Sequence, residues 1–201
     1  MTALGPVFIG LSGAIASGKS EALAALGRLG AATLSTDAVT HEILDEPATL
    51  ARLVERWGPD VGPGGKVDRV RVGEIVFERP DELRWLESIL HPLVGRRVLA
   101  WREELDESAE LAVVEVPLLF EAGMEQFFDA TLVVVAPDER RTEWAGDRGT
   151  GSVEGRSARQ LTQAEKAERA TFTVANDGDL DDLEAALREL WPRLLAVREA
   201  R

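Results

Sequence analysis

The stretch that decides the fold is Gly13-Ala-Ile-Ala-Ser-Gly-Lys-Ser20. It matches G-x-x-x-x-G-K-[ST], the pattern of the phosphate-binding P-loop. An apolar run over residues 7–11 precedes it, and apolar residues at helical spacing follow it over residues 21–29. A strand, a glycine-rich turn and a helix form the context that this motif requires. The sequence therefore predicts a nucleoside triphosphate site here rather than an ordinary glycine turn.

The residue types of this loop suit a chain of phosphates. Gly13 and Gly18 let the backbone curve around an anion without a Cβ in the way. The N–H groups of the turn and the N-terminus of the helix then face the phosphates. Lys19 can reach the β- and γ-phosphates of ATP, and the hydroxyl of Ser20 can ligate Mg²⁺. The predicted contacts of the loop with the nucleotide are Gly13, Ala14, Ile15, Ala16, Ser17, Gly18, Lys19, Ser20 and Glu21.

Composition narrows the class of protein. The 201 residues suit one domain with insertions, and 45% of them are hydrophobic, which is enough for a packed core. A net charge of −13 argues against non-specific binding to nucleic acid or to a membrane, because both kinds of binding need basic patches on the protein. Cysteine is absent from the sequence and no apolar run reaches the ~20 residues of a membrane span. We therefore predict a cytoplasmic protein.

Four more apolar runs, over residues 31–35, 111–116, 131–136 and 171–175, predict strands. The runs over residues 111–116 and 131–136 are continuous rather than alternating, which favours a parallel sheet that is covered on both faces. We expect an α/β fold with a five-stranded parallel sheet flanked by helices.

Polar side chains follow two of these strands. Thr36 and Asp37 come directly after the second strand, at the edge where open α/β sheets bind ligands, although either residue could instead cap the next helix. Glu115 lies at the end of the third strand, like the Walker-B acid that sits near Mg²⁺.

The chain is expected to have three parts. Residues 1–37, 106–139 and 170–201 make the P-loop core. Residues 38–105 are mostly helical in pattern, with a break at His91-Pro92, and exceed a normal crossover, so they predict an acceptor-binding domain. Residues 140–169 are polar, arginine-rich and broken by glycines; they predict a lid that carries guanidinium groups to the triphosphate, in preference to a solvated helical hairpin.

Nearly the whole chain resembles the dephospho-coenzyme A kinase family. The His-Pro pair together with Pro-Leu-Leu-Phe-Glu, in this order after a P-loop, is the specific part of the resemblance. The matching segments are the P-loop, Thr36-Asp37-Ala38, Val67-Asp-Arg69, Leu86-Glu-Ser-Ile-Leu-His-Pro92, Val116-Pro-Leu-Leu-Phe-Glu121, Gln160, Glu165-Lys166 and Asn176-Asp-Gly178.

The resemblance implies ATP-dependent phosphorylation of the 3′-hydroxyl of dephospho-coenzyme A, the last step of coenzyme A synthesis, with ATP and Mg²⁺. It makes Asp37 the general base beside Lys19, and it places Ser20 and Glu115 at the metal. It assigns contacts with ATP to Arg148 and Arg156 of the lid, and to Asn176 and Gly178 at the adenine. The implied acceptor contacts are Thr36, Asp37, His91, Pro92, Pro117, Leu118, Leu119, Phe120 and Glu121.

The chain also departs from the family pattern. Ser35 replaces an acid, and Glu21 brings negative charge close to the triphosphate. Ala14 and Ala16 replace glycines, which matters only where the backbone needs a positive φ. Trp144 stands where a lid arginine is expected, and Arg140 or Arg141 could substitute from one turn earlier.

Other functions remain open on sequence alone. These are another small-molecule P-loop kinase that acts on a nucleoside or nucleotide, and a nucleotide-binding regulator with weakened catalysis. A GTPase-like switch is disfavoured because the guanine-reading N-K-x-D signature is absent from the sequence. We expect a small-molecule substrate and a monomer or weak homo-oligomer.

Overall fold

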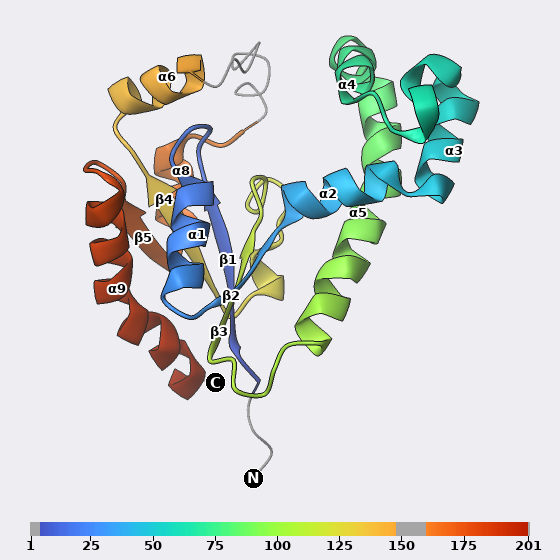
Figure 1. Ribbon diagram of the computed structural model, residues 1–201. Coiled ribbons are helices and arrows are strands. Elements are labelled where there is room, and N and C mark those ends of the chain that lie inside the picture. The colour runs from blue at the N-terminus through green and yellow to red at the C-terminus, as the bar shows by residue number, and fades with distance from the viewer. Residues whose placement is uncertain (1–4, 148–159, 201) are drawn as a thin grey trace. The chain divides into compact units, whose positions relative to one another are not determined.

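The computed structural model describes residues 5–147 and 160–200 (Figure 1). The chain divides into two compact units. Met1–Ser35 with Leu105–Arg201 form the first, called the core unit here, and Thr36–Glu104 form the second, called the helical unit.

The core unit is built on the five-stranded parallel sheet that the sequence predicts. The strands lie in the order β2-β3-β1-β4-β5, and every neighbouring pair is parallel. Their carboxyl ends therefore share one edge of the sheet, where ligands of open α/β sheets bind. The bounds are β1 Val7–Gly13, β2 Ala32–Ser35, β3 Leu111–Glu115, β4 Ala130–Val135 and β5 Phe172–Ala175.

Helices cover both faces of this sheet. The helices α1 and α9 pack against each other and against one face, while α8 contacts β1 and β4 (Figure 1). The bounds in the core unit are α1 Lys19–Arg28, η3 Glu125–Phe127, α6 Asp138–Asp147, α8 Gln163–Arg169, α9 Leu180–Ala196 and η4 Val197–Ala200.

Successive side chains of β1 point to opposite faces of the sheet. Ile9 and Leu11 belong to the apolar cluster formed with α1 and α9. Phe8 stacks on Phe128 with ring centroids 4.9 Å apart, and Ser12 donates a hydrogen bond to the carbonyl of Pro117. Every residue of β1 is buried, which explains why its apolar run shows no alternation with polar residues.

The helical unit corrects one prediction. The sequence predicts a break between two helices at His91-Pro92, but the single helix α5 continues through both residues. Proline removes one backbone donor and costs a helix about 3 kcal/mol. Leu86, Ile89 and Leu90 are buried, so packing of this face offsets that cost. The bounds are α2 Thr36–Asp45, α3 Pro47–Trp57, η1 Pro59–Val61, η2 Pro63–Gly65, α4 Arg69–Glu78 and α5 Pro80–Glu103.

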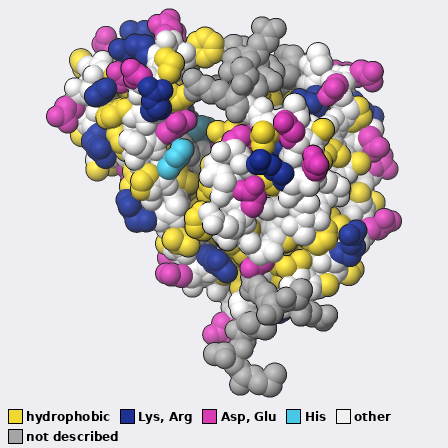
Figure 2. All heavy atoms as spheres, turned by 180° about the vertical axis from the view of Figure 1, so that it is seen from behind, with side chains coloured by type: hydrophobic (Ala, Val, Ile, Leu, Met, Phe, Trp, Pro, Cys, Tyr) yellow, Lys and Arg dark blue, Asp and Glu magenta, His cyan; other side chains and the backbone are white. Residues whose placement is uncertain are grey.

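The surface charges are mixed. Figure 2 shows acidic and basic side chains interspersed over the face that it draws. Several form ion pairs within the helical unit, including Arg69 with Asp45 at 2.9 Å and Arg97 with Glu46 at 2.8 Å.

Within residues 5–147 and 160–200, each helix is too short or too polar to cross a lipid bilayer.

Glu82 is the most connected acid of the helical unit. Its carboxylate accepts hydrogen bonds from Nε of Arg56 at 2.9 Å and from Nε1 of Trp57 at 2.8 Å, and Arg79 lies 3.8 Å away. The bond from Arg56, followed by the bond from Trp57, lowers the pKa of Glu82. These contacts join the end of α3 to the start of α5.

Glu82→Gln is expected to lower the thermal stability of the protein at neutral pH. A carboxylate whose pKa is lowered by folding stabilises the fold above its ordinary pKa of about 4.3 and loses that effect as the pH falls through the lower folded value. The variant should therefore lose less stability than the wild type on acidification, as measured by thermal unfolding at several pH values. Glu74→Gln, at a more exposed acid that pairs with Arg71, is the control. Identical pH profiles for Glu82→Gln and the wild type would contradict this role.

Candidate active site

The loop between β1 and α1 adopts a conformation that depends on its glycines. Gly18 is the N-cap of α1 with a φ of 91°, in the left-handed region that favours glycine. A Cβ at Gly18 would overlap the side-chain amide of Asn176. Gly18 also has no side chain to cap α1, and an anion can take that place at the helix N-terminus. The left-handed φ and the close approach of Asn176 together make glycine necessary at position 18.

Ala16 is strained in the same loop. Its φ is 59°, and within residues 5–147 and 160–200 no other residue except glycines has a positive φ. The left-handed region costs a residue with a Cβ roughly 1–2 kcal/mol. Ala14, the other departure from glycine in the loop, has no positive φ. The replacement of a glycine is therefore unfavourable at position 16 but not at position 14.

Asn176 holds the P-loop from the far end of the chain. Its Nδ2 donates to the carbonyl of Ser17 at 3.0 Å, and its side chain is buried. Its own N–H donates to the carbonyl of Val135 at 2.7 Å, so the residue after β5 is fixed to β4. Sequence reasoning missed this anchoring role, because the bond spans 159 positions. Contact of Asn176 and Gly178 with adenine stays a prediction.

Lys19 and Ser20 open α1. Nζ of Lys19 donates to the carbonyl of Ala14 at 2.8 Å, so the lysine lies along the loop. Ser20 is exposed in the first turn, and Glu21 is the acid of that turn. An acid near a helix N-terminus stabilises the helix but competes with a bound anion for the same partial charge.

The carboxyl edge of the sheet carries a buried acid. Glu115 is the last residue of β3, and the strand register aligns it with Leu11 of β1 and Ser35 of β2. Glu115 is only 4% exposed. Thr36 and Asp37 follow β2 directly, but α2 already includes both, so neither is a cap that precedes the helix. Thr36 is buried and Asp37 is exposed.

The side chains that are predicted at the metal carry oxygen atoms, the ligand type that magnesium prefers. Among the described residues no group of three or more His, Cys, Asp or Glu side chains could hold a metal ion by itself. Mg²⁺ at a nucleotide, however, is usually held by one or two protein oxygens together with phosphates and water. The hydroxyl of Ser20 and the carboxylate of Glu115 are hard oxygen ligands of this kind.

The segment after β3 is part of the core. Leu119 and Phe120 are 0% and 2% exposed, whereas Leu118 is 41% exposed. Leu119 lies so close to Gly10 of β1 that a Cβ there would overlap it. Contact of Pro117–Glu121 with the acceptor stays a prediction, and packing already accounts for the apolar side chains at 119 and 120.

The other predicted acceptor residues lie in the helical unit. His91 and Pro92 stand next to each other on α5, and both are exposed. Their role in acceptor binding also stays a prediction.

Two arginines of α6 have separate partners. Nε of Arg141 donates to the carbonyl of Ile15 in the P-loop at 3.1 Å, and its Nη1 pairs with Asp138 at 2.7 Å. Arg140 donates to the carbonyl of Gly178 and lies over the ring of Trp144, 5.9 Å from its centroid. Arg141 is therefore the one that reaches the phosphate loop. The predicted lid contacts Arg148 and Arg156 lie outside the described residues.

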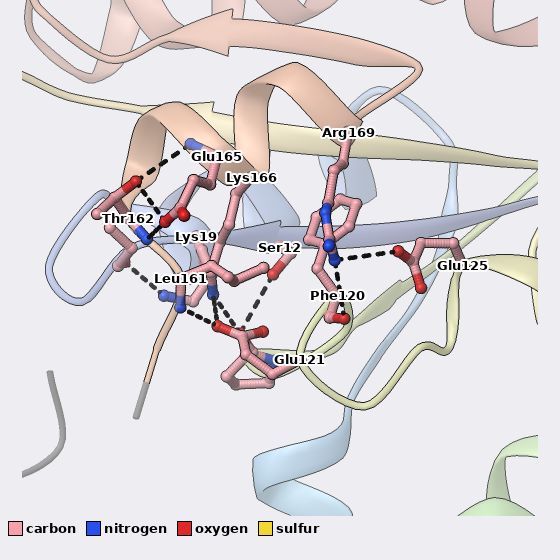
Figure 3. A network of polar contacts seen from close by, with 12 residues as sticks. Ser12, Lys19, Phe120, Glu121, Glu125, Leu161, Thr162, Glu165, Lys166 and Arg169 are labelled. Carbon is pink, nitrogen blue, oxygen red and sulfur yellow. Dashed lines mark hydrogen bonds and ion pairs between the residues drawn. The ribbon is translucent and has the colours of Figure 1, made fainter. Parts of the chain in front are cut away.

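An ion pair that the sequence did not predict lies beside this edge. Lys166 of α8 is fully buried, and its Nζ is 3.0 Å from Oε1 of Glu121 (Figure 3). The same Nζ donates to the carbonyl of Pro117 at 2.8 Å. The Glu-Lys pair at 165–166 was visible in the sequence as part of the family pattern, but nothing local connected it with the turn after β3.

Comparison with known proteins gives consistent matches. The family model described as dephospho-CoA kinase matches residues 7–182. A dephospho-CoA kinase of Deinococcus radiodurans is 40% identical over 193 residues, covering 92% of this chain and 93% of that protein. A crystal structure from Thermus thermophilus has a TM-score of 0.78 at 36% identity and covers 95% of this chain and 99% of that one. A dephospho-CoA kinase from Campylobacter jejuni has a TM-score of 0.66 at 27% identity, covering 93% and 96% of the two chains.

Ala16→Gly is expected to stabilise the protein, because glycine removes the left-handed strain at this position. The gain is offset in part by the flexibility of glycine in the unfolded chain, which leaves a net ~0.5–1 kcal/mol and a rise in Tm of roughly 1–3 °C. Ala14→Gly is the control and should lower Tm, since it adds flexibility without relieving strain. Thermal unfolding of the three proteins measures this difference, and a lower Tm for Ala16→Gly would contradict it.

Proposed function

The chain belongs to the dephospho-CoA kinase family, and from this premise we propose that it transfers the γ-phosphoryl group of ATP to the 3′-hydroxyl of dephospho-coenzyme A. The products are coenzyme A and ADP. The observation that carries the proposal is a P-loop, folded for an anion at the edge of a parallel sheet, within a chain whose residues 7–182 match the family. The alternatives of another small-molecule kinase and of a regulator with weakened catalysis are not favoured.

The donor half of the site is the P-loop. The backbone of residues 13–20 and the N-terminus of α1 cradle the phosphates of ATP. Lys19 exchanges its bond with Ala14 for a contact with the β- and γ-phosphates, and Arg141 adds a guanidinium group from α6. Ser20 and Glu115 would hold Mg²⁺, which when bound neutralises charge on the phosphates.

The acceptor half needs a base and a pocket. Asp37 accepts the proton of the 3′-hydroxyl as that oxygen bonds to the γ-phosphorus and the bond to the ADP oxygen breaks. This in-line transfer uses no covalent enzyme intermediate. Thr36, His91, Pro92 and the segment Pro117–Glu121 bind dephospho-coenzyme A.

Other parts of the proposal rest on the resemblance alone. Lid contacts from Arg148 and Arg156, and adenine contacts from Asn176 and Gly178, belong to it. A cytoplasmic location and a monomeric or weakly oligomeric state stay predictions.

The protein is expected to convert dephospho-coenzyme A into coenzyme A in the presence of ATP and Mg²⁺. Mass spectrometry of the reaction detects the product directly. Asp37→Asn should bind both substrates with unchanged affinity and lose roughly 10²–10⁴-fold in kcat, the range of general base catalysis. Asp45→Asn, on the same helix, is the matched control and should keep its kcat.

Two outcomes would count against this reaction or against the role of Asp37. Absence of coenzyme A from a reaction in which the wild type still binds ATP would overturn the kinase. Normal turnover by Asp37→Asn would remove Asp37 as the base and leave the overall reaction in place.

Arg141→Met is expected to reduce kcat/KM for ATP by about tenfold or more, because it removes a charged donor from the phosphate loop. Arg140→Met should cost less, since the guanidinium of Arg140 is engaged by Gly178 and Trp144. Arg188→Met on α9, where the arginine is 68% exposed, controls for loss of positive charge. Steady-state kinetics with varied ATP measures all three; a larger loss for Arg140→Met than for Arg141→Met would reverse the assignment.

A further inference from the structure

Lys166 is a fully buried cation that the proposed chemistry does not use. We propose that Lys166 is a positioning residue for the acceptor: it fixes the segment Pro117–Glu121 so that dephospho-coenzyme A can bind against it. This role rests on the proposed function, which assigns that segment to the acceptor.

One ammonium group holds both ends of the segment. Nζ of Lys166 donates to the carbonyl of Pro117 at 2.8 Å and pairs with Oε1 of Glu121 at 3.0 Å. The carbonyl of Pro117 also accepts a hydrogen bond from Ser12 of β1 at 3.2 Å. Figure 3 shows Lys166 and Arg169 reaching from α8 toward the turn that carries Phe120 and Glu121. The first and last residues of the segment are thereby tied to one point on α8.

The helix that carries Lys166 is itself held in place at its N-terminus. Thr162 caps α8 in a capping box with Glu165. Gln163 donates to the carbonyl of Ala136 at 3.0 Å and accepts from the N–H of Ala136 at 2.9 Å, which fixes α8 to the end of β4. A lysine on a helix that is pinned in this way presents its ammonium group at a defined place.

The carboxylate of Glu121 makes a second connection. Its Oε1 also accepts from the N–H of Leu161 at 2.9 Å. The segment that enters α8 and the segment that leaves β3 therefore meet at one oxygen atom. A shift of Glu121 would disturb both segments together.

Stability alone is a weak reason for this pair. A buried ion pair often stabilises a fold no better than apolar side chains of the same size, because both charges lose their hydration. Its hydrogen bonds, however, fix the position of a carbonyl and a carboxylate within narrow limits. The arrangement thus gives the turn a fixed geometry, and a turn that binds the acceptor needs such a geometry.

Arg169 provides an internal comparison. It lies on the same helix and faces the same turn, with Nη1 at 3.4 Å from the carbonyl of Phe120 and 3.8 Å from Glu125. Its side chain is 51% exposed, so water screens these longer contacts. Replacing Arg169 therefore removes a cation from α8 while the contacts of Lys166 with Pro117 and Glu121 stay in place.

The experiment compares Lys166→Met, Glu121→Gln, the double variant Lys166→Met/Glu121→Gln, and Arg169→Met. Thermal unfolding measures stability, and steady-state kinetics measure KM for dephospho-coenzyme A and for ATP. Lys166→Met should lower Tm, because it leaves the carboxylate of Glu121 without its cation. It should also raise KM for the acceptor roughly tenfold, as expected for the loss of an anchoring hydrogen bond, while KM for ATP changes less than about twofold.

The double variant separates positioning from stability. Replacing the carboxylate by an amide should restore Tm, yet KM for the acceptor should stay high, because the carbonyl of Pro117 has still lost its lysine. Glu121→Gln alone keeps the bond to Pro117 and should show the smaller rise in KM. Arg169→Met, which loses a longer and water-screened bond to Phe120, should raise KM for the acceptor less than Lys166→Met does. If Lys166→Met alone does not fold, the comparison of KM between the double variant and Glu121→Gln still tests the role of Lys166.

Two results would overturn this role. A double variant with the acceptor KM of Glu121→Gln, or equal rises in KM for both substrates, would make Lys166 a structural residue only. Failure of the wild type to form coenzyme A is a distinct result: it would overturn the proposed function, and the positioning role with it.

Discussion

The structure depends on one constraint at the P-loop: the backbone must face an anion while both of its ends are fixed in the sheet and in α1. β1 supplies the first fixed end, since it lies between β3 and β4 and is buried throughout. Gly18 makes the turn into α1 possible with its left-handed φ, and Asn176 occupies the space that a side chain at position 18 would need. The loop is thus shaped by packing from outside as well as by its own glycines. Such a preorganised site loses little free energy in ordering itself when phosphates bind.

Residues late in the chain hold the segments that the early strands deliver. Asn176 follows β5 and fixes the P-loop, while Gln163 and Lys166 on α8 fix the end of β4 and the turn after β3. A parallel sheet makes this possible, because each strand ends at the same edge and its following segment is within reach of the others. The P-loop and the segment Pro117–Glu121 are therefore both held by residues from late in the chain, through hydrogen bonds with defined directions.

Local patterns in the sequence were sufficient for the five strands and the P-loop. Burial of β1, β3 and β4 within the sheet produces continuous apolar runs, and the loop has its own motif. The break expected at His91-Pro92 was wrong because packing of one helix face outweighed the local effect of proline. The positive φ of Ala16 was not predictable, since it follows from the path of the loop rather than from the residue type. The contacts Asn176–Ser17 and Lys166–Glu121 join segments 159 and 45 positions apart, so no local pattern reveals them. The family resemblance included Asn176 and Lys166, but it did not imply their contacts with Ser17 and Glu121.

In the proposed reaction, the γ-phosphoryl group of ATP moves directly to the 3′-oxygen of dephospho-coenzyme A. Phosphorus NMR of the purified product, combined with phosphorus–proton correlation, tests it most directly. Direct transfer predicts one new phosphomonoester signal, coupled to the proton on the 3′ carbon of the ribose, together with an equal amount of ADP. A signal coupled to the 2′ proton instead, or release of inorganic phosphate without any new ester, would contradict it.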